Sequence, residues 1–84
     1  MEKTWEAIKM REYRFTVFFE PLEKGGYNVI VPAIPEICTS GETLDEARDM
    51  ARDAIRCFIE SATETGEPIP KDIEPTKEQI VVNL

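Results

Sequence analysis

Histidine is absent from this chain of 84 residues, and cysteine occurs only twice, at Cys38 and Cys57. Without histidine the chain lacks the commonest general base and metal ligand. The two cysteines match neither a zinc-binding spacing nor a Cys-x-x-Cys redox motif. We therefore expect no catalytic residues, no metal, no cofactor and no disulfide, and we interpret both cysteines as small, partly buried side chains.

Basic residues are also few, because 10 lysines and arginines stand against 17 aspartates and glutamates, for a net charge of −7. A nucleic-acid-binding surface needs a surplus of basic residues, so we expect no direct nucleic-acid binding and a preference for a basic partner. No apolar run is long enough to cross a bilayer, and residues 1–10 do not resemble a signal peptide. These features predict a cytoplasmic protein that does not bind membranes.

The small size predicts one domain with a thin hydrophobic core. A chain of this length buries only about 60–65% of its unfolded surface. Association with another copy would bury more apolar surface. We therefore expect a homo-oligomer, either a dimer or a larger assembly.

Two stretches near the N-terminus have the alternation typical of strands. In residues 13–20, Phe15, Val17 and Phe19 share one face. Residues 27–32 form the second stretch, and the intervening "PLEKGG" contains the glycines that a tight turn requires. The sequence therefore predicts a β-hairpin, with residues 13–84 as the domain and residues 1–12 as an N-terminal extension. That extension is either genuine or the product of an upstream start codon.

The middle of the chain predicts a short strand and then a long helix. Pro32 and Pro35 cannot donate hydrogen bonds to a sheet, so we expect the third strand only over residues 37–40. Thr43 and Glu46 have the spacing of a capping box, and Gly66 is placed to end the helix. Apolar residues recur at spacings of three and four on one helix face. They are Leu44, Ala47, Met50, Ala51, Ala54, Ile55, Phe58, Ile59 and Ala62.

Residues 78–84 alternate again, with Ile80, Val82 and Leu84 in phase, and predict a last strand. The helix would return the chain so that this strand lies parallel to the first one. The predicted fold is α+β in the order β-β-β-α-β, with one long helix on one face of a small mixed sheet.

Several motifs between Tyr13 and Pro70 resemble the HicB antitoxin family. They are Gly26-Tyr27-x-Val29-x-Val31-Pro32-x-Ile34-Pro35-Glu36, Thr39-x-Gly41-x-Thr43-x-Asp45-Glu46-Ala47, Ala54-Ile55-x-x-Phe58-Ile59-Glu60 and Gly66-Glu67-Pro68-Ile69-Pro70. We interpret the motif residues as mainly structural. The chief ones are Tyr27, Val31, Pro32, Pro35, Gly41, Thr43, Glu46, Ala47 and Gly66.

The resemblance implies a partial RNase H-like fold and a function in binding. In this family the domain binds and silences HicA, a small basic toxin that cleaves messenger RNA and has a double-stranded-RNA-binding-like fold. Typical members also carry a C-terminal DNA-binding domain, but this sequence stops at Leu84. We therefore do not extend operator binding to this chain.

Two nucleic-acid functions fit the sequence poorly. An RNase H-type nuclease needs converging carboxylates with at least one inside its first strand, where this chain has Phe15 to Phe19 and reaches Glu20 only at the end. A double-stranded-RNA-binding domain would require a helix at residues 4–10 and a basic start to the long helix. That start reads "TLDEARD" and is acidic.

The sequence also predicts two surfaces. On the helix, Asp45–Arg48, Asp49–Arg52 and Asp53–Arg56 are spaced for ion pairs that neutralise a solvated face. On the sheet, the alternation that buries Val17 directs Phe18, Ile30 and Val81 away from the helix. An uncovered apolar patch of this kind usually marks a contact surface, so we predict a possible interface at these three residues.

Three functions remain as hypotheses, and a small nuclease is by far the weakest of them. The first is a toxin-neutralising binding module, in which acidic residues between Glu60 and Glu78 attract a HicA-like toxin. The alternative is a stand-alone regulatory or adaptor oligomer without a toxin partner.

Overall fold

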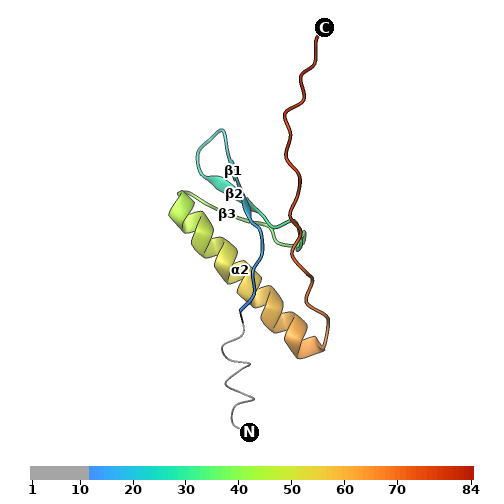
Figure 1. The fold of residues 1–84 in the computed structure, drawn as a ribbon. Coiled ribbons are helices and arrows are strands. Elements are labelled where there is room, and N and C mark those ends of the chain that lie inside the picture. The colour runs from blue at the N-terminus through green and yellow to red at the C-terminus, as the bar shows by residue number, and fades with distance from the viewer. Residues whose placement is uncertain (1–11) are drawn as a thin grey trace.

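The computed structural model describes residues 12–84, which form a three-stranded sheet and one long helix (Figure 1). In chain order these elements are β1 (Phe18–Pro21), β2 (Tyr27–Ile30), β3 (Thr39–Gly41) and α2 (Leu44–Thr65). The strands pair in the order β1-β2-β3, and α2 covers one face of the sheet. The α+β class is therefore confirmed. Except for Glu12, the predicted extension lies outside the described residues, as does the helix considered at 4–10.

The predicted hairpin is present, with shorter strands than the sequence indicated. Phe18 lies opposite Ile30, and the Leu22 N–H donates to the Gly26 carbonyl at 3.0 Å. The prediction that β1 begins at residue 13 is wrong. In this register Pro32 would lie opposite Thr16, and because proline has no N–H it cannot continue the ladder.

Pro32 and Pro35 each lie in one of two consecutive turns, Val31–Ile34 and Ile34–Ile37, which together form a proline-bounded loop that closes the core. The Ile34 N–H donates to the Val31 carbonyl at 2.9 Å, and the Ile37 N–H donates to the Ile34 carbonyl at 3.1 Å. Because the second turn uses the Ile37 N–H, β3 starts at Thr39 and not at residue 37 as predicted. The Ile34 side chain is fully buried, with 0% exposure. The proline-bounded loop therefore supplies a core residue.

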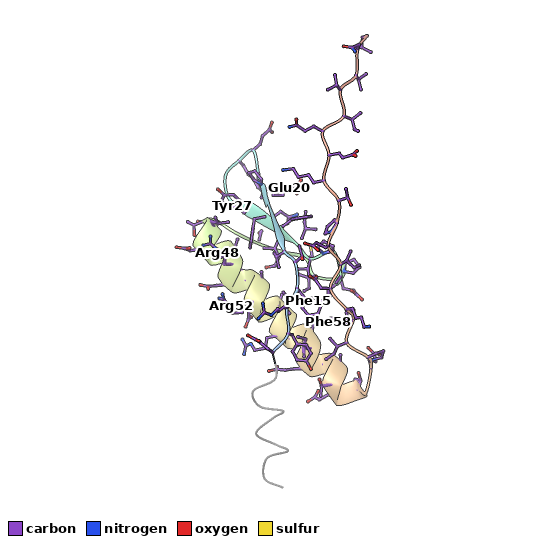
Figure 2. The ribbon with its side chains drawn as sticks, in the orientation of Figure 1. Phe15, Glu20, Tyr27, Arg48, Arg52 and Phe58 are labelled. Atoms are coloured by element: carbon purple, nitrogen blue, oxygen red, sulfur yellow. The ribbon has the colours of Figure 1, made fainter. Side chains whose placement is uncertain are left out.

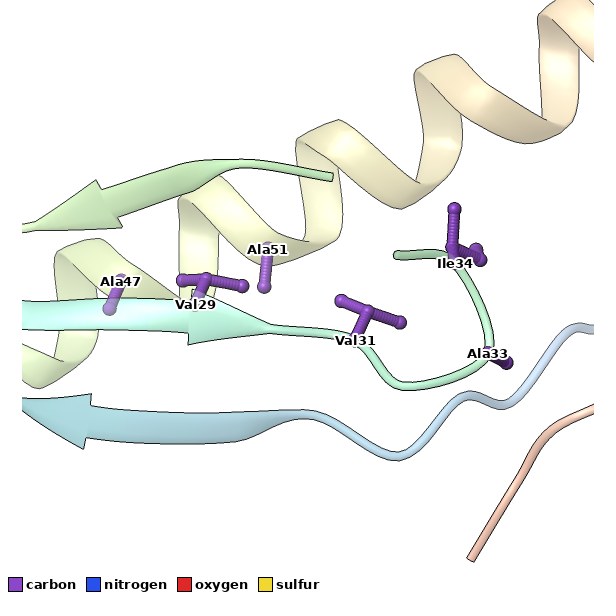
Figure 3. Close-up of a cluster of buried hydrophobic side chains, with 6 residues drawn as sticks. All are labelled: Val29, Val31, Ala33, Ile34, Ala47 and Ala51. Carbon is purple, nitrogen blue, oxygen red and sulfur yellow. The ribbon is translucent and has the colours of Figure 1, made fainter. Parts of the chain in front are cut away.

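The core lies between β2, the proline-bounded loop and α2 (Figure 3). Its buried residues are Val29, Val31, Ala33, Ile34, Ala47 and Ala51. Phe15, Val17 and Phe19 pack against this cluster, as the alternation predicted. The helix contributes only alanines to this cluster, Ala47 and Ala51. Because their side chains are small, α2 can lie close to the sheet (Figure 3). On the same helix Met50 is exposed, which corrects its predicted place on the buried face.

Both ends of α2 have the predicted caps. The Glu46 N–H donates to Thr43 Oγ1 at 3.0 Å, while the Glu46 carboxylate accepts from the Glu42 N–H at 2.6 Å. At the other end Gly66 adopts a left-handed conformation with φ of 77°. The Gly66 and Glu67 N–H groups donate to the carbonyls of Thr63 and Ala62, which is a Schellman motif. Local hydrogen bonds therefore define where the helix begins and ends.

The prediction of a last strand at residues 78–84 is wrong for the structure of one isolated copy of the chain. Residues 67–84 belong to no strand, and the described sheet is antiparallel, not mixed. Ile80 and Val82, expected under the helix, are 74% and 72% exposed. Hydrogen bonds hold Asp72 beside Thr16, just before β1 begins, and β1 ends only five residues later at Pro21. The twelve residues that follow Asp72 are therefore longer than the strand beside which they start. The apolar end of the chain therefore extends past the hairpin, where its own sheet offers no strand to pair with (Figure 1).

Candidate interaction surfaces

The sheet face opposite α2 carries two of the three predicted interface residues. Phe18 and Ile30 lie directly across from each other in the β1–β2 pair and are 43% and 38% exposed. Val81 is 82% exposed but belongs to the segment that extends past the hairpin, so the structure does not place it on an adjacent strand. We call Phe18 and Ile30 the open-face pair.

An apolar groove lies on the helix side of the sheet, beside β1. We call it the β1–α2 groove, and it has a volume of about 510 Å³. Phe15, Val17 and Phe19 line it from the β1 side, and Ala51 and Ile55 line it from α2. These phenylalanine and valine side chains are only partly buried, so the groove leaves apolar surface in contact with water.

Two arginines of α2, Arg48 and Arg52, also line the β1–α2 groove (Figure 2). Arg48 bonds to Asp45 at 2.6 Å, and Arg52 bonds to Asp49 at 3.3 Å. Arg56 pairs with Asp53 in the same way, so the predicted ion pairs are confirmed. Their charges are compensated along the helix, and arginine stems can cover apolar surface. The groove is therefore suited to apolar side chains.

The outer edge of β1 has no neighbouring strand among the described residues. The Leu22 N–H points to Gly26 across the hairpin. The N–H and C=O groups of successive residues point to opposite sides of a strand, and Phe19 is an odd number of residues from Leu22. The N–H and C=O of Phe19 therefore point away from β2. Pro21 has the same parity, so its missing N–H also falls on this outer side, where proline is tolerated. The outer side of β1 can therefore accept a further strand.

Asp72 ties the C-terminal segment to the start of β1, and sequence reasoning missed it. Its carboxylate accepts from the Thr16 N–H at 2.8 Å and from the Thr16 hydroxyl at 2.7 Å. The backbone hydrogen bond from Thr16, reinforced by the hydroxyl, lowers the pKa of Asp72 below its ordinary value. The sequence shows only an aspartate in a polar, proline-rich stretch, so the pairing over 56 positions had no local signal.

The family-motif residues are placed around the core and the helix start. Val31 and Ala47 are buried, Tyr27 and Pro32 are half-buried, and Pro35 is exposed. The remaining ones form the helix caps or approach the helix closely. They are Gly41, Thr43, Glu46 and Gly66.

The two cysteines, Cys38 and Cys57, are both free and exposed, which corrects the expectation that they are partly buried. Within residues 12–84 there is no group of three or more histidine, cysteine, aspartate or glutamate side chains arranged to hold a metal ion. Over the same range, no helix combines the length and apolar character needed to span a membrane.

The sequence model of a protein family, the HicB_like antitoxin of bacterial toxin-antitoxin systems, matches residues 15–81 of this chain. The match includes all three strands, the helix and most of the C-terminal segment. It therefore covers the open-face pair, Asp72 and most of the β1–α2 groove, whose lining also includes Tyr13 and Arg14.

Three related proteins show the extent of the similarity. Antitoxin HicB 1 of Photorhabdus laumondii is 44% identical over 61 residues, which are 73% of this chain and 39% of that protein. Antitoxin HicB of Escherichia coli K12 is 40% identical over 57 residues, 68% of this chain and 41% of that protein. The UPF0150 protein Ta0767 of Thermoplasma acidophilum is 42% identical over 59 residues, 70% of this chain and 86% of its own length. The chain thus spans about two fifths of the relatives named as antitoxins.

Proposed function

Because this chain belongs to the HicB-like antitoxin family of bacterial toxin–antitoxin systems, we propose that it is a non-catalytic module that binds and neutralises a toxin. The partner is a small basic HicA-like toxin that cleaves messenger RNA, and inhibition occurs by covering its RNA-binding surface. The observation that carries this proposal is the family match over residues 15–81, which includes every described strand and helix.

The charge distribution supports a basic partner. Acidic residues outnumber basic ones by seven over the whole chain. Between residues 60 and 78 six acids accompany two lysines, and all eight side chains are exposed. Such a surface attracts a basic protein at long range before contacts form. It also repels RNA and DNA phosphates, so we propose that the chain does not bind operator DNA by itself.

The family's partial RNase H-like architecture serves binding and not hydrolysis in this proposal. Phe18 and Phe19 occupy the first half of β1, and Glu20 follows as an exposed side chain. An RNase H-type metal site requires carboxylates that converge from several elements. Apolar residues in the first half of β1 favour packing against another protein.

We place the protein in the cytoplasm as a homo-oligomer, without membrane contact. The open-face pair, together with Val81, is the possible interface between copies. Burying a large apolar side chain completely is worth roughly 1.5–3 kcal/mol, and a thin core leaves such side chains exposed. Phe18→Glu, checked for folding by circular dichroism, would lower the oligomer mass in sedimentation if this face is used.

The proposed function is tested with the product of an adjacent gene that encodes a short basic protein. We expect co-expression to yield a stable complex, and we expect the purified chain to stop that toxin's cleavage of RNA at one equivalent of binding sites. The control is the same toxin with an unrelated protein of equal negative charge, which should leave cleavage unchanged. If no basic toxin co-purifies from the native cell and the chain still forms an oligomer, the stand-alone regulatory or adaptor function replaces this proposal.

A further inference from the structure

The C-terminal end of the chain has the pattern of a strand but no strand beside it. Ile80, Val82 and Leu84 alternate with Gln79, Val81 and Asn83, and residues 79–84 are all exposed. We call residues 79–84 the tail. Exposed apolar residues at strand spacing, with their backbone groups unpaired, form a template for pairing with another sheet.

The structure also has a sheet edge with matching chemistry. The outer side of β1 presents the Phe19 N–H and C=O, and the β1–α2 groove lies on the helix side of that edge. A strand added there directs alternate side chains to opposite faces. With Ile80 and Val82 directed into the groove, Val81 falls beside Phe18 on the open face. One orientation of the tail therefore buries Ile80 and Val82 in the groove and brings Val81 into contact with Phe18.

The tail does not reach this edge in its own chain. Asp72 is held at Thr16, and residues 76–78 lie near Phe18 and Phe19. The tail consequently begins where β1 ends and continues past the hairpin (Figure 1). To bring Ile80 opposite Phe19, the chain would have to break both Thr16 hydrogen bonds and fold back on itself.

The segment that precedes the tail resists folding back. Residues 67–78 contain Pro68, Pro70 and Pro75, and proline-rich segments act as extended, semi-rigid spacers. In the structure this segment is extended and forms no turn. It therefore holds the tail away from its own sheet, where it is accessible to a second molecule.

We propose that the tail of one copy adds as an edge strand to β1 of a second copy, and that two copies exchange tails reciprocally. Main-chain hydrogen bonds to the outer side of β1 supply part of the affinity, as in other cases of strand addition. Ile80 and Val82 occupy the partner's β1–α2 groove. A twofold exchange uses the same two surfaces on both copies, so it closes as a dimer and leaves no tail free.

The test compares the wild type with two full-length variants that carry the same added charge. Ile80→Asp with Val82→Asp places two carboxylates on the groove side of the tail. Gln79→Asp with Asn83→Asp places two carboxylates at the other parity, where we expect them to remain in water. Sedimentation equilibrium should show the dimer dissociation constant rising by about 100-fold or more in the first variant and changing little in the second.

Amide hydrogen exchange at Phe19 distinguishes exchange between copies from pairing within one chain. In the wild type, we expect the Phe19 amide to exchange at least about tenfold more slowly above the dimer dissociation constant than below it. The Ile80→Asp, Val82→Asp variant should lose this protection at concentrations where the Gln79→Asp, Asn83→Asp variant keeps it. This readout needs no change in the groove, so it does not depend on the folding of a core variant.

Three outcomes would overturn the proposal. Protection of the Phe19 amide that does not vary with concentration would mean that the tail pairs within its own chain. An amide that is never protected would mean that the edge of β1 stays open. Protection that rises equally in all three proteins would mean that a surface other than the tail covers this edge.

Discussion

Gly41 is a residue of β3 whose backbone lies very close to the helix. A Cβ at this position would lie 2.4 Å from the Ala47 N and 2.7 Å from the Ala47 Cα. These are backbone atoms, so neither can move aside without shifting the first turn of α2. Glycine at position 41 is therefore required by the distance between two elements.

We expect Gly41→Ala to lower the free energy of unfolding by about 1–3 kcal/mol, which is typical of overpacking in a closely packed region. Urea denaturation followed by circular dichroism measures the change. Ser40→Ala, at the exposed neighbouring position, is the control and should stay within about 0.5 kcal/mol of the wild type. Equal stability of the two variants would contradict the close approach.

Asp72 makes the position of the C-terminal segment depend on pH. Because hydrogen bonds from Thr16 lower the pKa of Asp72 in the folded chain, the ionised form is favoured there. The stabilisation is therefore complete above the ordinary value of 3.8 and is lost as the pH falls through the lowered folded value.

We expect the Thr16 amide resonance to titrate in this acidic range and the C-terminal segment to leave β1 as it does. Asp72→Ala removes both acceptors, so it should abolish the titration and release the segment at neutral pH, as seen by nuclear magnetic resonance. Glu74→Gln removes a charge from the same segment without touching Thr16, so it should leave the titration in place. A Thr16 amide that is insensitive to acid in the wild type would show that Asp72 does not hold the segment.

At the scale of elements, α2 is defined by its two ends. Thr43 accepts the Glu46 N–H, and the Gly66 and Glu67 N–H groups satisfy carbonyls of the last turn. In a capping box the N3 side chain normally accepts from the N–H of the N-cap residue, but Glu46 here accepts from the Glu42 N–H, one position earlier. Glu46 therefore connects the helix start to the end of β3.

We expect Thr43→Ala to cost about 1 kcal/mol of stability, because the Glu46 N–H loses its acceptor. Thr43→Ser keeps the hydroxyl and should cost less than half as much. Both are measured by urea denaturation. Equal losses in the two variants would mean that the methyl group of Thr43, and not its hydroxyl, stabilises this end of the helix.

For the whole molecule, the net charge influences the rate of association with a charged partner. A charge of −7 on 84 residues attracts any positively charged protein over a distance set by the salt concentration. The Debye length falls from about 30 Å at 0.01 M to about 3 Å at 1 M ionic strength. Rates of association therefore report on this long-range attraction more directly than affinities do.

We expect the association rate constant with a basic toxin to fall about tenfold or more over this range of salt. Replacing Glu60, Glu64 and Glu67 with glutamine should lower the rate at low salt and flatten its salt dependence, with a smaller effect on dissociation. Stopped-flow mixing measures both rates. A salt-independent association rate in the wild type would remove charge steering from the proposed mechanism.

The elements determined by the sequence alone are those whose signals are local. The turn glycines and strand alternation specified the hairpin, and Thr43, Glu46 and Gly66 specified the helix ends. The i,i+3 aspartate–arginine pairs were also readable, because helix geometry fixes which side chains are neighbours. In each case the interacting groups are close in the sequence, so their spacing contains the information.

Only the tertiary structure decided the features that depend on distant partners. It shortened β1 because Pro32 would lie opposite Thr16 in the hairpin register, filled the core with Ile34 from between two prolines, and held Asp72 at Thr16. It also left residues 78–84 unpaired, although their alternation is that of a strand. Alternation states which side chains of a strand share a face, but it does not supply the neighbouring strand. A helix contains its own hydrogen-bond partners, whereas a strand is completed only by another part of the chain or by another molecule.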